Sequence, residues 1–209
     1  MRVALCGGTG QAGSRILKEL LDRGHTVVAI VRDPAKVMTQ QRLTAVKGDV
    51  SDEAGIVEAI RGADALVSAY GPGPEQPGLL VPATKHLLAA ARTSGVPRFL
   101  FVGGAGALEV APGVTLIASG NLPAEWLPIA QAHADALALA RSSDINWTSL
   151  APSAFFEAGQ RTGKFRLATD SLIVDDKQQS RISFEDFAKA LVDELEMPRH
   201  ERKRFTVGY

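Results

Sequence analysis

The first feature with a clear chemical use is a glycine-rich segment near the start of the 209-residue chain. Gly7, Gly10 and Gly13 are spaced Gly-x-x-Gly-x-x-Gly between a short apolar run and a helical stretch. Glycine allows a tight turn there and lets the backbone approach a pyrophosphate, which then faces the free amides of the helix start. The alternative is an ordinary glycine-rich turn. We expect a phosphate-binding loop that comprises Gly7, Thr9, Gly10, Gln11, Ala12 and Gly13.

The ends of the second and third apolar runs bear on which dinucleotide this loop holds. NAD-binding folds tend to place an acidic residue after the second strand, for the ribose 2′-hydroxyl. Here Arg32 comes first, and a guanidinium suits a 2′-phosphate, whereas Asp33 is explained as the cap before Pro34. The sequence favours NADP(H) over NAD(H), with a solvated surface charge as the alternative for Arg32. We expect Asp49 and Val50 at the adenine edge, although Asp49 equally fits a cap for the next helix.

Residues after the fourth and fifth runs are expected beside the nicotinamide. Ser68 and Ala69 are expected to flank its ribose, and Gly103 and Gly104 to leave room for a flat ring. Tyr70 is a candidate proton donor.

The acceptor side offers a second set of candidates. His133 is a second potential proton donor, although its apolar neighbours also fit a core or solvent position. Ser153, Phe155 and Phe156 follow the sixth run and are expected near the substrate, where the phenylalanines either stack on the acceptor or belong to the core. Arg161 either holds an anionic substrate tail with Lys164 or lies on the surface of a hairpin.

The elements that must position these residues alternate between short β-rich runs and longer helical stretches. This alternation predicts βαβ units with a parallel sheet covered by helices on both faces, a Rossmann-type α/β fold. The expected strands are Val3–Cys6, Thr26–Val31, Leu43–Lys47, Ala65–Ala69, Arg98–Val102 and Trp147–Leu150. The expected helices are Ala12–Arg23, Asp52–Arg61, Leu79–Thr93 and Pro128–Ser142.

The pattern changes after Pro152. A hairpin is predicted over Thr162–Val174, a helix capped by Ser183 over Ser183–Glu196, and a last strand over Phe205–Val207. We interpret residues 1–209 as one nucleotide-binding domain, in which residues 151–209 form a lid or substrate-side elaboration.

Composition excludes several classes of protein. With 23 basic and 23 acidic residues the formal net charge is zero, which argues against a general nucleic-acid binder. One cysteine cannot form an intramolecular disulfide or a cysteine-based metal site, and no metal is expected. No apolar run is long enough for a membrane span or a secretory signal. We therefore expect a cytoplasmic protein, either a monomer or a small homo-oligomer, whose partner is a small redox acceptor.

Several motifs together resemble a known family. They are VALCGGTGQAGSRI, VVAIVRDP, GDVSD, FLFVGGAGALEV, NWTSLAPSAFF, RTGKFRLATD and RISFEDFAKALVDELE, and they span essentially the whole chain. The sequence resembles atypical short-chain dehydrogenases/reductases, and more narrowly the small NAD(P)H-binding proteins described as NADH–flavin reductases and the biliverdin reductase-like group. The resemblance implies a Rossmann-type fold and a reduced dinucleotide.

The chain departs from typical short-chain dehydrogenases in one respect. Neither of its two tyrosines, Tyr70 and Tyr209, is followed by lysine in the Tyr-x-x-x-Lys pattern that protonates a carbonyl. Hydride transfer to a flavin (FMN or FAD) or a quinone needs less acid from the protein. We therefore expect a flavin or quinone reductase. The alternatives are a non-catalytic NAD(P)(H)-binding redox sensor and an epimerase or dehydratase.

Overall fold

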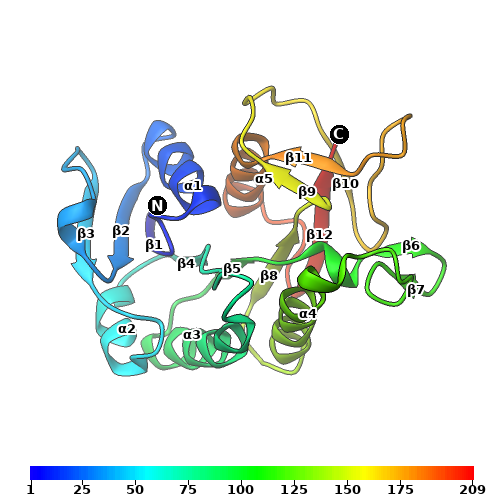
Figure 1. The fold of residues 1–209 in the computed structure, drawn as a ribbon. Helices are drawn as coiled ribbons and strands as arrows, with labels where there is room; N and C mark the ends of the chain where they lie inside the picture. Colours follow the sequence, from blue (N-terminus) through cyan, green and yellow to red (C-terminus); the bar gives the residue numbers. More distant parts are fainter.

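The computed structural model describes residues 1–209 and contains a central sheet of eight strands, ordered β10-β12-β8-β5-β4-β1-β2-β3 (Figure 1). Seven strands are parallel, and β10 pairs antiparallel with β12 at one edge. The strands are β1 Arg2–Cys6, β2 Thr26–Val31, β3 Leu43–Lys47, β4 Ala65–Ser68, β5 Phe99–Val102, β8 Trp147–Ala151, β10 Arg166–Ala168 and β12 Lys203–Gly208. This order confirms the Rossmann-type fold. Successive strands are added outward from β1 to β3 on one side of the sheet and from β4 onward on the other, so the strand order switches between β1 and β4.

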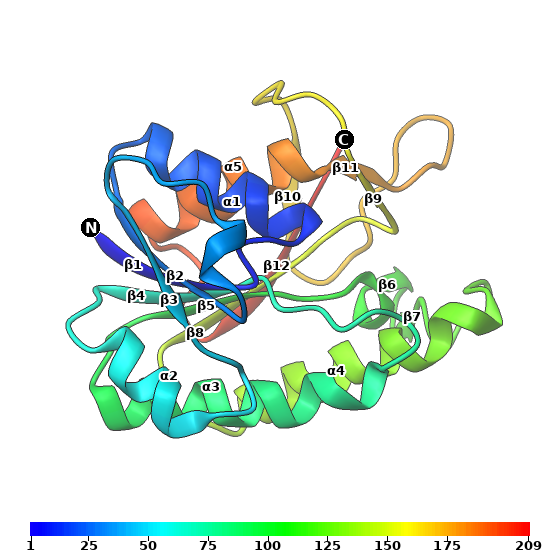
Figure 2. The same cartoon turned by 60° about the vertical axis from the view of Figure 1, so that its left-hand side comes forward.

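Helices cover both faces of the sheet (Figure 2). One layer holds α1 Gln11–Asp22 and α5 Phe184–Glu196, and the other holds α2 Glu53–Ile60, α3 Leu80–Ser94 and α4 Leu127–Arg141. A buried apolar cluster lies under each layer, which explains why the central strands are apolar on both sides. None of the α-helices combines the length and apolar character that a membrane crossing requires.

Local signals set most helix ends as expected. The Asp52 carboxylate accepts from the Gly55 amide at the start of α2, and the Ser183 hydroxyl accepts from the Asp186 amide at the start of α5. Gly95 ends α3 in the left-handed conformation with φ +71°. These caps satisfy backbone groups that the helices leave unpaired.

The short elements all belong to loops that connect the main strands and helices. They are the 3-10 turns η1 Pro34–Lys36, η2 Pro77–Leu79, η3 Ala105–Ala107 and η4 Ala124–Trp126, the antiparallel pair β6 Glu109–Ala111 and β7 Val114–Thr115, and the parallel pair β9 Phe155–Glu157 and β11 Arg181–Ser183. The η2, η4, β6–β7 and β9 segments follow the carboxyl ends of β4, β5 and β8.

The hairpin predicted over residues 162–174 is wrong. Gly163 does adopt a turn conformation, with φ +69°, but the two flanking runs do not pair with each other. Residues 166–168 pair with β12 instead, and Ser171 bridges to Glu109. The chain does turn at Gly163, but the backbone groups that a hairpin would pair with each other are hydrogen-bonded to more distant segments.

Candidate functional site

The glycine loop between β1 and α1 is pressed against the end of β4. Gly7 has φ +77°, and a Cβ atom there would lie 2.6 Å from the carbonyl of Ala69. A Cβ atom on Gly13 would lie 2.0 Å from the Gly7 carbonyl oxygen. Both positions therefore require glycine, one for its backbone conformation and both for close packing.

The start of α1 leaves its amides open. No side chain caps the helix at Gly10, and its first turn holds no acidic residue. No backbone acceptor pairs with the amides of Gln11, Ala12 or Gly13. Unpaired amides at the positive end of a helix form a cradle for an anion, so this loop fits the pyrophosphate of a dinucleotide.

A cavity of about 400 Å³ opens beside this cradle, at the carboxyl ends of β1, β2, β3 and β4. Eight of the residues that the sequence predicted line it: Gly7, Thr9, Gly10, Arg32, Asp49, Val50, Ala69 and Tyr70. The structure adds nine more, namely Ile30, Val31, Gly48, Ser51, Gly71, Leu79, Pro82, Ala83 and His86. The His86 imidazole is hydrogen-bonded through Nδ1 to the Val50 carbonyl at 3.0 Å, which joins α3 to the loop after β3.

Arg32 and Asp49 are the charged residues of this cavity. Arg32 is exposed and makes no ion pair, whereas its neighbour Asp33 accepts from the Ala35 amide as the cap of η1. The Asp49 carboxylate accepts from the amide and hydroxyl of Ser51 at 2.9 and 2.7 Å. These bonds, with Arg32 nearby, lower the pKa of Asp49. Since Asp52 caps α2, Asp49 is not the cap of that helix.

Tyr70 belongs to the Arg32 and Asp49 end of the cavity. Burial and the nearby Asp49 carboxylate raise the pKa of its phenol, so the phenol stays protonated at neutral pH. Its ring packs against a small cluster that includes Ala132 of α4. Ser68 lies outside the cavity, where its hydroxyl accepts from the Tyr70 amide at 3.3 Å.

His133 lies near the carboxyl end of β5, against the backbone of Gly104. A Cβ atom on Gly104 would lie 2.8 Å from the Cβ of His133, and one on Gly103 would lie 2.6 Å from the Ser149 hydroxyl oxygen. The chain itself therefore fills the space that we expected these glycines to leave for a ring. Burial lowers the pKa of His133 to about 4, so its imidazole is neutral at pH 7 and makes no hydrogen bond within the chain.

The three substrate-side candidates have different surroundings. The Ser153 side chain is buried and donates to the Val207 carbonyl at 2.9 Å, so it does not face an open site. Phe156 is partly buried, and its ring centroid lies 4.5 Å from that of Phe184. Phe155 is 60% exposed. The alternation of a strand explains why neighbouring phenylalanines on β9 face opposite ways, and Phe155 is the more accessible of the two to a ligand.

Three carboxylates hold the segment that follows β9. Arg161 forms two hydrogen bonds of 2.7 and 2.8 Å with Glu19 of α1, so it is already paired. These bonds, together with two hydrogen bonds from Arg23, lower the pKa of Glu19 to about 2. Glu185 accepts from the Gly159 amide, and Asp186 accepts from the Thr162 hydroxyl and the amide of Gly163. We call Glu19, Glu185 and Asp186 the anchoring carboxylates. No group of three or more His, Cys, Asp or Glu side chains is placed to hold a metal ion.

The comparisons with known proteins agree with this geometry. A family model described as NAD(P)H-binding matches residues 7–198. The uncharacterised protein YwnB of Bacillus subtilis is 41% identical over 211 residues, which cover 99% of this chain and 98% of YwnB.

Two solved structures are similar over their whole length. A proposed epimerase of Bacteroides thetaiotaomicron is 39% identical with a TM-score of 0.93, and the match covers 100% of this chain and 96% of that one. A proposed NADH–flavin reductase of Streptococcus pneumoniae is 33% identical with a TM-score of 0.90 and coverage of 100% and 99%. The glycine cradle, the cavity beside it and these matches show that the chain belongs to the NAD(P)H-binding family of Rossmann-fold, oxidoreductase-like proteins.

Proposed function

We propose that this protein is an NADPH-dependent reductase that passes a hydride to a flavin or quinone-like acceptor. The observation that carries the proposal is the kind of proton donor that the chain places beside Gly104, at the carboxyl end of β5. There the candidate donor is His133, which burial keeps neutral at pH 7. A carbonyl substrate needs a proton as hydride arrives, whereas a flavin or quinone ring delocalises the charge. The similarity to a proposed NADH–flavin reductase supports this acceptor class.

The preference for NADP(H) rests on Arg32. Its guanidinium is exposed at the end of β2 and free of ion pairs, next to a cavity that the cradle shares. A free guanidinium pairs well with the 2′-phosphate that distinguishes NADP(H). Asp33, the residue that would favour an NAD ribose, already caps η1.

Each part of the site has a distinct task in this proposal. The reduced nicotinamide, when bound, supplies the hydride. The amides of α1 hold the pyrophosphate, and Asp49, whose lowered pKa keeps it ionised, accepts from the adenine amino group. His133 offers one N–H donor to the acceptor without carrying a charge. Orientation of two flat rings against each other then provides most of the acceleration.

Nucleotide titration followed by absorbance at 340 nm tests the proposal. The protein is titrated with NADPH and NADH, and oxidation is then followed with riboflavin, FMN and menadione as acceptors. We expect tighter binding of NADPH and turnover faster than the reaction without protein. Tight NADPH binding with no turnover of any acceptor would contradict the reductase and indicate a non-catalytic sensor.

A further inference from the structure

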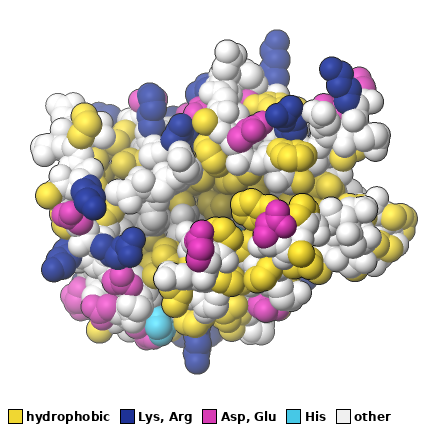
Figure 3. All heavy atoms as spheres, in the orientation of Figure 1, with side chains coloured by type: hydrophobic (Ala, Val, Ile, Leu, Met, Phe, Trp, Pro, Cys, Tyr) yellow, Lys and Arg dark blue, Asp and Glu magenta, His cyan; other side chains and the backbone are white.

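Exposed apolar side chains concentrate at the carboxyl edge of the sheet. Ten large apolar residues of the chain are exposed. Six of them belong to segments that leave this edge: Leu79, Val110, Val114, Trp126, Leu127 and Phe155. Figure 3 shows apolar side chains gathered around a hollow on this face. Clustered exposed apolar surface at such an edge marks a ligand site.

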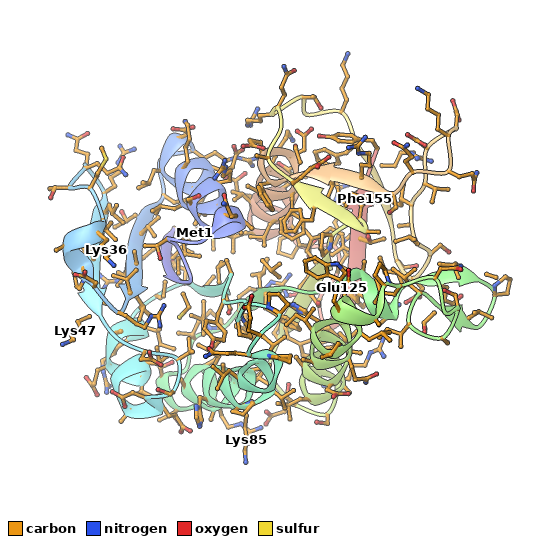
Figure 4. The ribbon with its side chains drawn as sticks, viewed as in Figure 1. Met1, Lys36, Lys47, Lys85, Glu125 and Phe155 are labelled. Atoms are coloured by element: carbon orange, nitrogen blue, oxygen red, sulfur yellow. The ribbon has the colours of Figure 1, made fainter.

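Two of these six exposed side chains are aromatic, and they are carried by two different elements, β9 and η4. Phe155 lies on β9 and is 60% exposed, and Trp126 ends η4 and is 49% exposed. In Figure 4, Phe155 on β9 lies above Glu125, the residue before Trp126 on η4. β9 and η4 follow different strands of the sheet, so the two walls are independent of each other.

The wall that carries Phe155 is firmly supported. Phe156 packs behind it against Phe184 and Phe187, with ring centroids 4.5 and 4.7 Å apart. Arg181 lies over the Phe155 ring, 5.9 Å from its centroid, and forms an ion pair of 2.7 Å with Glu157. The backbone that carries Phe155 is therefore held in place before any ligand arrives, and its exposed ring favours a flat partner that stacks on it.

The opposite wall carries an unbalanced negative charge. Glu125 is exposed and has no ion-pair or hydrogen-bond partner within the chain. Figure 3 shows acidic side chains at the lower rim of the hollow with no basic side chain between them. The guanidinium of Arg181 on the other wall is already paired with Glu157. A negative charge at this rim repels an acceptor with an anionic tail.

We infer that Phe155 and Trp126 hold a planar aromatic acceptor between them and that Glu125 selects acceptors without an anionic tail. This inference rests on the proposed reductase function. Among flavins it singles out riboflavin over FMN, because the two share the same ring system and differ by one phosphate group.

Flavin binding tests the inference independently of turnover. Flavin fluorescence is titrated with the NADP⁺-bound protein, and the dissociation constants of riboflavin and FMN are compared at low and high salt. We expect riboflavin to bind roughly threefold or more tightly than FMN at low salt, with the difference disappearing at about 1 M salt, where screening is short-ranged. Glu125→Gln is expected to remove the difference at low salt, whereas the exposed Glu58→Gln on α2 keeps it.

The aromatic pair is tested with the same titration. Phe155→Ala and Trp126→Ala are each expected to weaken both flavins roughly tenfold, by analogy with aromatic stacking elsewhere, while NADPH affinity and melting temperature stay unchanged. Met197→Ala removes an equally exposed apolar side chain from the end of α5 and is the matched control.

Two results would overturn the inference: equal binding of riboflavin and FMN at low salt, or wild-type flavin affinity in both aromatic variants. A protein that binds riboflavin as described but never oxidises NADPH would refute the reductase and leave the aromatic site standing. Failure of the inference and failure of the proposed function are thus distinguishable.

Discussion

Gly10 and Gly13 belong to the same loop, but the structure predicts opposite consequences when each becomes alanine. Gly10 has φ −77° and ψ 175°, which any residue adopts, and a Cβ atom there would meet only the Gly7 oxygen, at 3.4 Å. Gly10 lines the cavity, so the new methyl group would enter the space of the pyrophosphate. Gly10→Ala is therefore expected to fold normally and to bind NADPH poorly.

The magnitudes follow from these contacts. Alanine is a weak helix cap, so Gly10→Ala is expected to cost about 1 kcal/mol of unfolding free energy at most. The loss of one charge-assisted amide–phosphate hydrogen bond is worth roughly 1.5–3 kcal/mol, or about a 10- to 100-fold weaker NADPH complex. Gly13→Ala places a methyl group 2.0 Å from the Gly7 oxygen, so backbone must move. Overpacking of this kind costs roughly 1–3 kcal/mol, and a contact this short belongs at the upper end, about 3 kcal/mol.

Thermal unfolding with and without NADPH separates the two effects. For a chain of this size, about 3 kcal/mol lowers the melting temperature by roughly 6–12 °C, so Gly13→Ala is expected to melt that much earlier than wild type without nucleotide. Gly10→Ala is expected to melt within about 4 °C of wild type and to lose the stabilisation that NADPH gives the wild-type protein. Wild-type NADPH affinity in Gly10→Ala, or a wild-type melting temperature in Gly13→Ala, would refute the reasoning.

Three further predictions concern charged and titratable groups. Arg32→Gln is expected to weaken NADPH roughly tenfold and to leave NADH unchanged in a fluorescence titration, because only the 2′-phosphate loses a partner; equal loss for both nucleotides would contradict this. Because the pKa of His133 is lowered to about 4, kcat/KM is expected to show no loss of activity with an apparent pKa of 6–7; such a loss, removed by His133→Gln, would contradict a neutral imidazole. The lowered pKa of Glu19, about 2 against 4.5, stabilises the fold by about 3 kcal/mol above pH 4.5, and this contribution is lost as pH falls toward 2. In urea unfolding, the free energy of unfolding of Glu19→Gln is therefore expected to be about 3 kcal/mol below that of wild type at pH 7 and about 1 kcal/mol below at pH 3. A difference that does not change with pH would contradict this role of the Glu19 pKa.

The features of the fold that depend on local sequence could be predicted. Continuous apolar runs identify the strands that are buried on both faces, because burial selects apolar side chains. The glycine spacing identifies the loop, because only glycine fits the close backbone contacts there. Asp49 is an example of a residue whose role the local sequence leaves open. Two aspartates three residues apart both fit a helix cap, and only the observed bond from Gly55 to Asp52 assigns the cap.

Residues whose environment depends on distant partners could not be assigned. Phe155 and Phe156 are equivalent by sequence, and the pairing of β9 with β11, a strand that begins 26 residues later, decides which one is exposed. His86 carries no motif, yet the packing of α3 brings it to the Val50 carbonyl. Ser153 follows the end of a strand, where site residues are expected, but its hydroxyl donates to the Val207 carbonyl of β12.

The anchoring carboxylates have a consequence for how the proposed reductase would select its acceptors. Residues 159–163 are tied to α1 and α5 by Glu19, Glu185 and Asp186, so this wall has little freedom to close around a ligand. In the proposed reductase, acceptors would then be sorted by exclusion at a fixed opening rather than by induced fit, and a small acceptor would exchange without waiting for a gate to move. In such a protein, a new range of acceptors arises most simply by exchanging an exposed side chain such as Phe155, with the supporting structure left intact.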